Sequence, residues 1–189
     1  MTTTNAQPRR LVISQNCTLD GSIEMLGEWF DPQESDKGEL DQLLAESKRC
    51  DALLLGRQTF EDFRSYWPNV EDDQTGITDD LNAQDKFVVS STMTDPQWSR
   101  TTIFSGDWES QVRDLKQQGG GDIVVTGSIN LCHALIEAGL VDEYRLYIYP
   151  TVQGRGRRLF PERFEQGSLS LVGSHPFANG HVELIYRAG

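Results

Sequence analysis

Three short turns in the chain carry residue types that bind phosphate groups in proteins. Each turn follows an apolar run and supplies glycines or hydroxyls, and one adds an arginine: Gly56-Arg57-x-Thr59, Ser90-Ser91-Thr92 and Thr126-Gly127-Ser128. A helix that begins at such a turn presents unpaired amides and the positive end of its dipole, and both attract an anion. The guanidinium of Arg57 suits the extra phosphate of a 2′-phosphorylated dinucleotide. A single turn of this kind is usually only structural, but the three together predict a site for nucleotide phosphates.

The stretch from Asp122 to Gly139 shows how the chain positions one of these turns. Ile123–Val125 is a β-branched run typical of a strand that is buried on both faces. The apolar residues that follow recur at the helical period, with Ser128 as the expected N-cap and Gly139 at the C-terminal end. Because the carboxyl ends of parallel strands share one edge of a sheet, we expect all three turns to meet there.

The rest of the chain alternates between strand and helix patterns and ends in strands. Strands are expected near 9–16, 51–55, 86–90, 102–104, 123–125, 143–149, 169–173 and 182–186, with a first helix near 37–49. The last two strands have no helix between them, so they should pair as an antiparallel hairpin. The pattern predicts an α/β fold with a mostly parallel central sheet, helices on both faces and an antiparallel C-terminal hairpin. We expect one domain over 9–189, preceded by a flexible tail over 1–8.

Composition narrows the classes of partner and compartment. The net charge of −12 argues against nucleic acid and against an anionic membrane surface as partners. The sequence contains no apolar span of membrane length and no signal peptide. The cysteines Cys17, Cys50 and Cys132 form no CxxC pair and are typical of reduced thiols in a cytoplasmic protein. The histidines show no metal-ligand spacing, so no metal site is expected.

An ordered series of motifs resembles a known family. The series links the three turns to further segments on both sides: Thr18-Leu19-Asp20-Gly21, Leu55-Gly56-Arg57-x-Thr59-Phe60, Val88-Val89-Ser90-Ser91-Thr92, Gly139-Leu140-Val141-Asp142-Glu143 and Pro150-x-x-x-Gly154-x-Gly156-x-x-Leu159-Phe160. In this order the motifs are similar to the dihydrofolate reductase-like superfamily, in its RibD C-terminal-domain branch. The resemblance covers roughly residues 9–187. That branch includes the reductase domain of the riboflavin-pathway deaminase–reductase and stand-alone proteins, and the absence of the deaminase zinc motif leads us to expect a stand-alone reductase.

The resemblance implies NADPH as cofactor, hydride transfer to a small heterocyclic or sugar-bearing substrate, and a homodimer. It places Gly56, Arg57 and Thr59 at the adenosine side, with Arg57 near the 2′-phosphate. Ser90, Ser91 and Thr92 line the adenine-ribose end, while Thr126, Gly127, Ser128 and Ile129 surround the pyrophosphate. The loop of Thr18, Leu19, Asp20 and Gly21 lies beside the nicotinamide and the substrate.

Four residues are candidates for the substrate side, each with a structural alternative. Asp20 is the expected proton donor or substrate-orienting carboxylate, because it follows the first strand at the cofactor edge. Its alternative is a turn-forming Asp-Gly without a chemical role. Trp29, Phe30 and Trp67 are expected to wall the substrate pocket, and core packing is their alternative.

Two departures from the family pattern shape the functional prediction. Relatives often have Gly-Gly where this chain has Gly127-Ser128, and Ser has less backbone freedom. True dihydrofolate reductases place a carboxylate on the first helix, next to the pterin. On the corresponding helix of this chain, the carboxylates are interpreted as surface charges: Glu39, Asp41 and Glu46. This interpretation argues against folate reduction. The rival to the reductase is a nucleotide-binding dimer without turnover, acting as a sensor or an interaction module.

Overall fold

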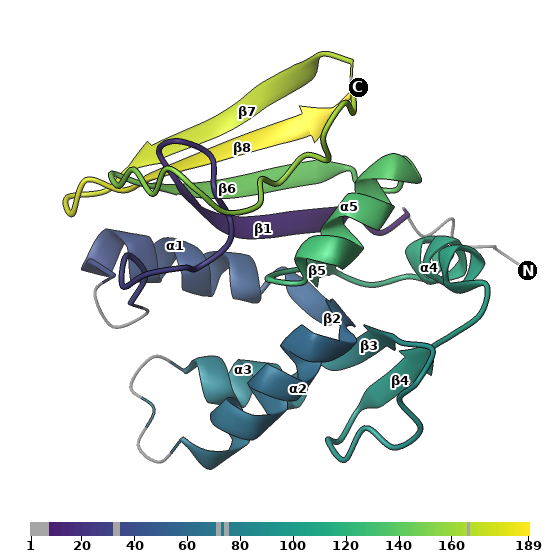
Figure 1. The fold of residues 1–189 in the computed structure, drawn as a ribbon. Helices are drawn as coiled ribbons and strands as arrows, with labels where there is room; N and C mark the ends of the chain where they lie inside the picture. The colour runs from purple at the N-terminus through teal and green to yellow at the C-terminus, as the bar shows by residue number, and fades with distance from the viewer. Residues whose placement is uncertain (1–7, 32–34, 71–72, 74–75, 166) are drawn as a thin grey trace, which may run out of the picture.

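One eight-stranded sheet in the order β4-β3-β2-β5-β1-β6-β8-β7 runs through the molecule (Figure 1). The computed structural model describes residues 8–31, 35–70, 73, 76–165 and 167–189, so most of the expected N-terminal tail lies outside the described residues. The strands are β1 Leu11–Thr18, β2 Cys50–Gly56, β3 Asp85–Val89, β4 Thr101–Phe104, β5 Asp122–Val125, β6 Glu143–Tyr149, β7 Leu169–Pro176 and β8 Val182–Ala188.

The helices lie on both faces of this sheet. They are α1 Lys37–Ser47, α2 Arg57–Tyr66, α3 Ile77–Ala83, α4 Trp108–Gln117 and α5 Ile129–Glu137, and a 3-10 turn, η1 Trp67–Asn69, follows α2. On one face, α4 and α5 pack against the apolar side chains of the central strands. On the other face, α2 and α3 pack on β2 and β3 in a second apolar cluster, and α1 lies over β6.

The pairing of the strands confirms the expected fold class. The six strands from β4 to β6 are mutually parallel, whereas β8 pairs antiparallel with both β6 and β7. Leu11, Val12 and Ile13 of β1 are fully buried, because this strand lies between β5 and β6 with helices on both sides. A strand buried on both faces is favoured by β-branched and leucine side chains, as the sequence pattern predicted.

The surface-charge interpretation of α1 is wrong for two of its three carboxylates. Glu39 is 1% exposed and Glu46 is 6% exposed, because both side chains lie on the sheet side of α1. Glu39 contacts His181 Nδ1 at 3.0 Å, and Glu46 accepts a hydrogen bond of 3.0 Å from the hydroxyl of Tyr147 on β6. Of the three carboxylates, only Asp41 is exposed. Polar partners on β6 and in the turn before β8 make it possible to bury these carboxylates. The sequence of the helix alone does not show these partners.

Candidate functional site

The three predicted turns lie at the carboxyl edge of the parallel strands, and two of them, after β2 and after β5, line an open cleft of about 640 Å³. The cleft is lined by the residues that begin α2, by those that begin α5, and by Val89 at the end of β3. Within the described chain, neither α2 nor α5 has a side-chain cap at its N-terminus. Unpaired amides at the start of two helices make this edge suitable for an anion.

Two hydrogen bonds lock the turn after β5 to the turn after β2. The hydroxyl oxygen of Ser128 accepts from the backbone N–H of Gly56 at 3.0 Å, and the Ser128 N–H donates to the hydroxyl oxygen of Thr59 at 2.9 Å. The sequence predicted that Ser128 caps α5. Ser128 does occupy the N-cap position, but its side chain does not cap the helix. The hydroxyl instead accepts from the turn after β2, so the two turns form one unit.

Gly127 is required by this geometry. Its φ is +60°, and a Cβ at this position would lie 2.9 Å from Cγ2 of Thr59. Ser128 also has a positive φ, of +33°, which is a conformation that side-chain-bearing residues rarely adopt. The side-chain amide of Gln15 stabilises the turn by donating a hydrogen bond of 2.7 Å to the Gly127 carbonyl.

Two arginines stand at the cleft, each paired with a carboxylate. Arg57, the first residue of α2, lies 3.2 Å from Glu61 one helical turn later and is about half exposed. Arg157 reaches across from the loop before β7, with 2.7 Å to Glu24 and 3.1 Å to the side chain of Asn130 on α5. The Arg57–Glu61 pair is an exposed pair within one helix and is therefore weak, so the Arg57 guanidinium can turn to a phosphate. The Arg157 guanidinium is held more firmly, because it donates twice to Glu24 and once to Asn130.

The other predicted cofactor residues lie at the same edge. Thr18 is buried at the end of β1, while Leu19 is 66% exposed. The Ser90 hydroxyl oxygen accepts from the backbone N–H groups of Thr92 and Met93 at 3.2 and 3.0 Å, which shapes the loop after β3. Val89, rather than Ser90, Ser91 or Thr92, is the member of this segment that lines the cleft.

Asp20 ties two loops together. Its carboxylate accepts from the Thr18 hydroxyl at 2.6 Å and from the backbone N–H groups of Gln153 and Gly154 at 3.1 and 2.7 Å. The Thr18 hydrogen bond, with the two backbone ones, lowers the pKa of Asp20 to about 2. An ionised carboxylate cannot donate a proton at neutral pH. These contacts favour the structural alternative for Asp20 over the role of proton donor.

Trp29 and Phe30 pack on the end of β6. Their rings lie 5.2 and 5.9 Å from that of Tyr149 in edge-to-face contacts, and the Trp29 indole donates to Gln153 at 2.8 Å. Neither residue lines the cleft. Their contacts match the core-packing alternative, in which they fix the loop between β1 and α1 to the sheet.

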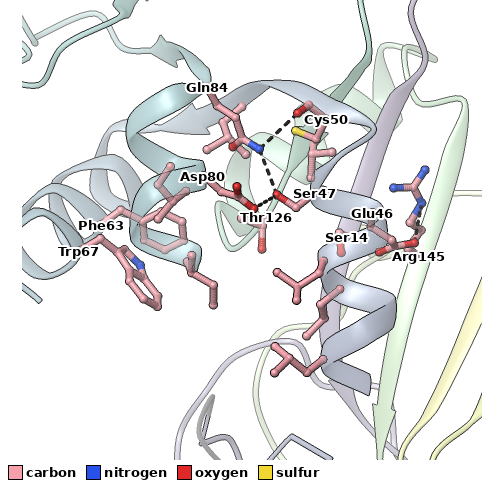
Figure 2. A pocket seen from close by; sticks show the side chains of 17 residues that line it. Ser14, Glu46, Ser47, Cys50, Phe63, Trp67, Asp80, Gln84, Thr126 and Arg145 are labelled. Carbon is pink, nitrogen blue, oxygen red and sulfur yellow. Dashed lines mark hydrogen bonds and ion pairs between the residues drawn. The ribbon is translucent and has the colours of Figure 1, made fainter. Parts of the chain in front are cut away.

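Trp67 instead lines a second cavity, of about 250 Å³, on the side of the sheet that carries α1, α2 and α3 (Figure 2). Phe63 and Trp67 form one wall of this cavity, and leucines of α1 form the wall opposite. Thr126 lines this second cavity while Gly127 and Ser128 line the cleft. The turn after β5 therefore lies between the cleft and the second cavity.

A buried group of charges stands behind the second cavity. Arg145 on β6 is 1% exposed in its side chain and lies 2.7 Å from Asp122, 2.7 Å from Glu143 and 3.2 Å from Glu46. Burial is the main cause that raises the pKa of Glu46, to about 8, and the neighbouring carboxylate of Glu183 adds to the shift. Two carboxyl groups at one buried site cannot both ionise easily, so Glu46 keeps its proton at neutral pH.

The described residues contain neither a metal centre nor a membrane span. No group of three or more His, Cys, Asp or Glu side chains among them is arranged to hold a metal ion. In the same part of the chain, no helix is long and apolar enough to cross a membrane. Burial raises the pKa of Cys132 to about 12, so its thiol is unreactive.

Several residues of the candidate site were not predicted from the sequence. Gln15 is a polar residue in a buried strand, and that position was a signal that could have marked it as a hydrogen-bonding group. The Glu24–Arg157 pair joins loops 133 residues apart, so no local pattern could have found it.

Comparisons with known proteins agree with this architecture. The model of the RibD C-terminal domain matches residues 9–182. The chain is similar to the uncharacterized protein YyaP of Bacillus subtilis (strain 168), with 31% identity over 192 residues, covering 98% of each protein.

Two solved structures share the fold. One is described as a candidate riboflavin biosynthesis protein from Shewanella sp. PV-4, with a TM-score of 0.72 and 23% identity over 95% of this chain and 99% of that one. The other is dihydrofolate reductase from Enterococcus faecalis complexed with NADP(H), with a TM-score of 0.63 and 18% identity over 94% and 95% of the two chains. The fold is thus dihydrofolate reductase-like, and the chain belongs to the RibD C-terminal domain family.

Proposed function

We propose that the protein is an NADPH-dependent reductase that transfers a hydride to a small heterocyclic substrate. The observation that carries the proposal is the pair of spaces on either side of the turn after β5. The cleft joins two uncapped helix N-termini with two arginines, and the adjacent cavity is mostly apolar. A reductase needs its cofactor site next to its substrate site, because hydride transfer requires contact between the nicotinamide ring and the substrate ring.

In this proposal the residues of the cleft hold the phosphates of the cofactor. The first turn of α5, with Gly127, Ser128 and Ile129, binds the pyrophosphate, and Arg57 binds the 2′-phosphate. When bound, NADPH supplies the hydride. Arg157 is a second cation for the pyrophosphate, since it contacts Asn130 of the same helix turn.

The reductase is favoured over the non-catalytic nucleotide-binding dimer by the position of two aromatic residues. In a protein that binds the nucleotide without turnover, Trp29 or Phe30 would fill the substrate space. Both rings pack on Tyr149 instead and line neither of the two spaces. The substrate space is therefore not filled by these side chains.

Calorimetric titration with NADPH and NADH side by side tests the proposal. We expect binding of both, with NADPH at least tenfold tighter, because the cleft offers a guanidinium to the extra phosphate. Binding of neither cofactor would refute the reductase. Binding of both, with no oxidation of NADPH by any compound in a panel of heterocycles, would favour the nucleotide-binding dimer.

We also propose that the protein forms a homodimer. The edge strand β7 presents Leu171 and Val172 with 55% and 46% of their surface exposed. Exposed apolar residues on an unpaired edge are typical of an association surface. Light scattering after size exclusion should give twice the chain mass of 21.3 kDa, and a monomer would contradict the proposal.

A further inference from the structure

We propose that the carboxylate of Glu24 competes with the phosphates of the cofactor for Arg157. The carboxylate pairs with the guanidinium until a phosphate takes its place, and it thereby lowers the affinity of the cleft for both nicotinamide dinucleotides. The inference rests on the proposed function, because the cleft is the cofactor site of the proposed reductase. It adds an internal contact that sets how tightly this site binds.

Glu24 brings a negative charge into a cleft that otherwise suits anions. It is the only carboxylate among the described residues that line the cleft, and the cations of the same lining are Arg57 and Arg157. Hydrogen bonds from the Arg157 side chain are the main cause that lowers the pKa of Glu24, so its carboxylate is ionised at neutral pH. The carboxylate therefore opposes the anions that the two helix N-termini attract.

The contacts of Glu24 are those that a phosphate group also makes in proteins. Its Oε1 accepts from Nε and Nη2 of Arg157 at 2.9 and 2.7 Å, and its Oε2 accepts from the backbone N–H of Arg157 at 3.0 Å. Guanidinium groups and backbone N–H groups are common donors to phosphate oxygens. Glu24 thus uses the donors that a phosphate would use.

Arg157 has no nitrogen left without a partner. Its Nη1 donates to the side-chain oxygen of Asn130 at 3.1 Å, while Nε and Nη2 donate to Glu24. Asn130 is the second residue of α5, the helix whose first turn is proposed to bind the pyrophosphate. A phosphate at this turn pairs fully with Arg157 only if it takes the place of Glu24.

The exposure of both side chains makes this exchange possible. The side chains of Arg157 and Glu24 are 49% and 26% exposed, so water and salt reach both charges and weaken their attraction. Glu24 can leave Arg157 and be solvated. The carboxylates around the buried Arg145 cannot leave in this way, because they would remain unpaired inside the protein.

The backbone around Glu24 is fixed by other contacts, so the exchange requires only side chains to move. The side-chain amide of Gln153 donates to the Ser22 hydroxyl at 2.9 Å and to the Glu24 carbonyl at 3.0 Å. The backbone N–H of Ile23 donates to the Arg157 carbonyl at 3.0 Å. Substitution of the Glu24 side chain should therefore leave this loop in place.

Calorimetric titration of Glu24→Gln with NADPH and with NADH tests the competition. We expect both cofactors to bind about fivefold more tightly than they bind to the wild type, because both carry the pyrophosphate and an exposed ion pair is weak. Asp41→Asn is the matched control: it also removes one negative charge, but it lies on α1 outside the cleft lining, so its affinities should not change. Circular dichroism confirms that each variant is folded.

Glu24→Asp separates competition for Arg157 from simple charge repulsion. The variant keeps the negative charge but is one methylene shorter, and the fixed backbone prevents it from reaching the guanidinium. We expect its affinity for both cofactors to lie between those of the wild type and Glu24→Gln. Repulsion alone would leave Glu24→Asp at the wild-type affinity.

Each result decides the inference. Unchanged affinity in Glu24→Gln, a gain for NADPH without one for NADH, or wild-type affinity in Glu24→Asp would each overturn it. If the wild type and the variants bind neither cofactor, the proposed reductase is refuted and the inference with it. If the wild type binds both cofactors and Glu24→Gln binds them no more tightly, only the role of Glu24 is wrong.

Discussion

The hydroxyl oxygen of Ser128 lies 3.0 Å from the backbone nitrogen of Gly56 and accepts its hydrogen bond. This contact joins residues 72 positions apart and makes one binding surface from the turns after β2 and β5. Ser128 has a φ of +33°, which is a strained conformation for a residue with a side chain. At this residue the hydrogen bond stabilises the fold and the backbone strain destabilises it.

Substitution of Ser128 separates these two effects. Ser128→Ala removes the hydrogen bond and keeps the strain, so the free energy of unfolding should fall by about 1 kcal/mol. Ser128→Gly also removes the hydrogen bond but relieves roughly 1–2 kcal/mol of left-handed strain. Urea denaturation should therefore rank Ser128→Gly above Ser128→Ala in stability. Equal stability of the two variants would show that the strain is not significant.

Gly127→Ala should weaken NADPH binding at least tenfold. The new Cβ would meet Cγ2 of Thr59 at 2.9 Å and displace the hydroxyl that receives the Ser128 N–H. Gly139→Ala is the matched control, because Gly139 has the similar φ of +63° but no atom within 4 Å of a new Cβ. Both variants should lose roughly 1–2 kcal/mol of stability, and only Gly127→Ala should lose affinity. The same affinity in both would contradict a role for the turn in cofactor binding.

Arg57→Ala should weaken NADPH binding far more than NADH binding. The variant removes the partner proposed for the 2′-phosphate, which NADH lacks. Glu61→Gln is a useful companion, since it frees Arg57 from its 3.2 Å ion pair and should tighten NADPH modestly. Titration of both cofactors against both variants measures the effect. Equal losses for the two cofactors in Arg57→Ala would show that Arg57 does not bind the extra phosphate.

Glu46→Gln should change how stability depends on pH. The pKa of Glu46 is about 8 in the folded protein and 4.5 in the unfolded chain, so between these values only the folded state keeps the proton. Stability from this group is therefore highest below pH 4.5 and falls as pH rises to 8, with a limiting slope of about 1.4 kcal/mol per pH unit. Glu46→Gln should remove this decline in denaturation curves at several pH values. The same change at the partly exposed Glu61 should not remove the decline. An unchanged profile in Glu46→Gln would show that Glu46 is ionised.

Asp20→Asn should destabilise the protein at neutral pH. The amide keeps one acceptor oxygen where the carboxylate accepts three hydrogen bonds. Because the pKa of Asp20 is lowered to about 2, the stability from its ionised form is complete above pH 3.8 and is lost as pH falls toward 2. Thermal unfolding at pH 7 and pH 2 should show a difference between wild type and variant only at pH 7. A stable variant with lost turnover would instead restore Asp20 as a catalytic candidate.

The sequence by itself determined the parallel core and the edge where the site lies. The β-branched run Ile123–Val125 and its Gly-containing turn are local patterns, and parallel strands bring their carboxyl ends together whatever else surrounds them. The family motifs were also local, and their order along the chain was enough to identify the fold.

Only the tertiary structure decided how the polar residues are used. Glu39 and Glu46 look like surface charges on a helix of leucines, but partners on β6 and in the turn before β8 make their burial possible. The leucines of the same helix line a cavity instead of filling the core. Whether a charge is buried depends on partners that are distant in sequence, because burial is favourable only when those partners compensate the lost water.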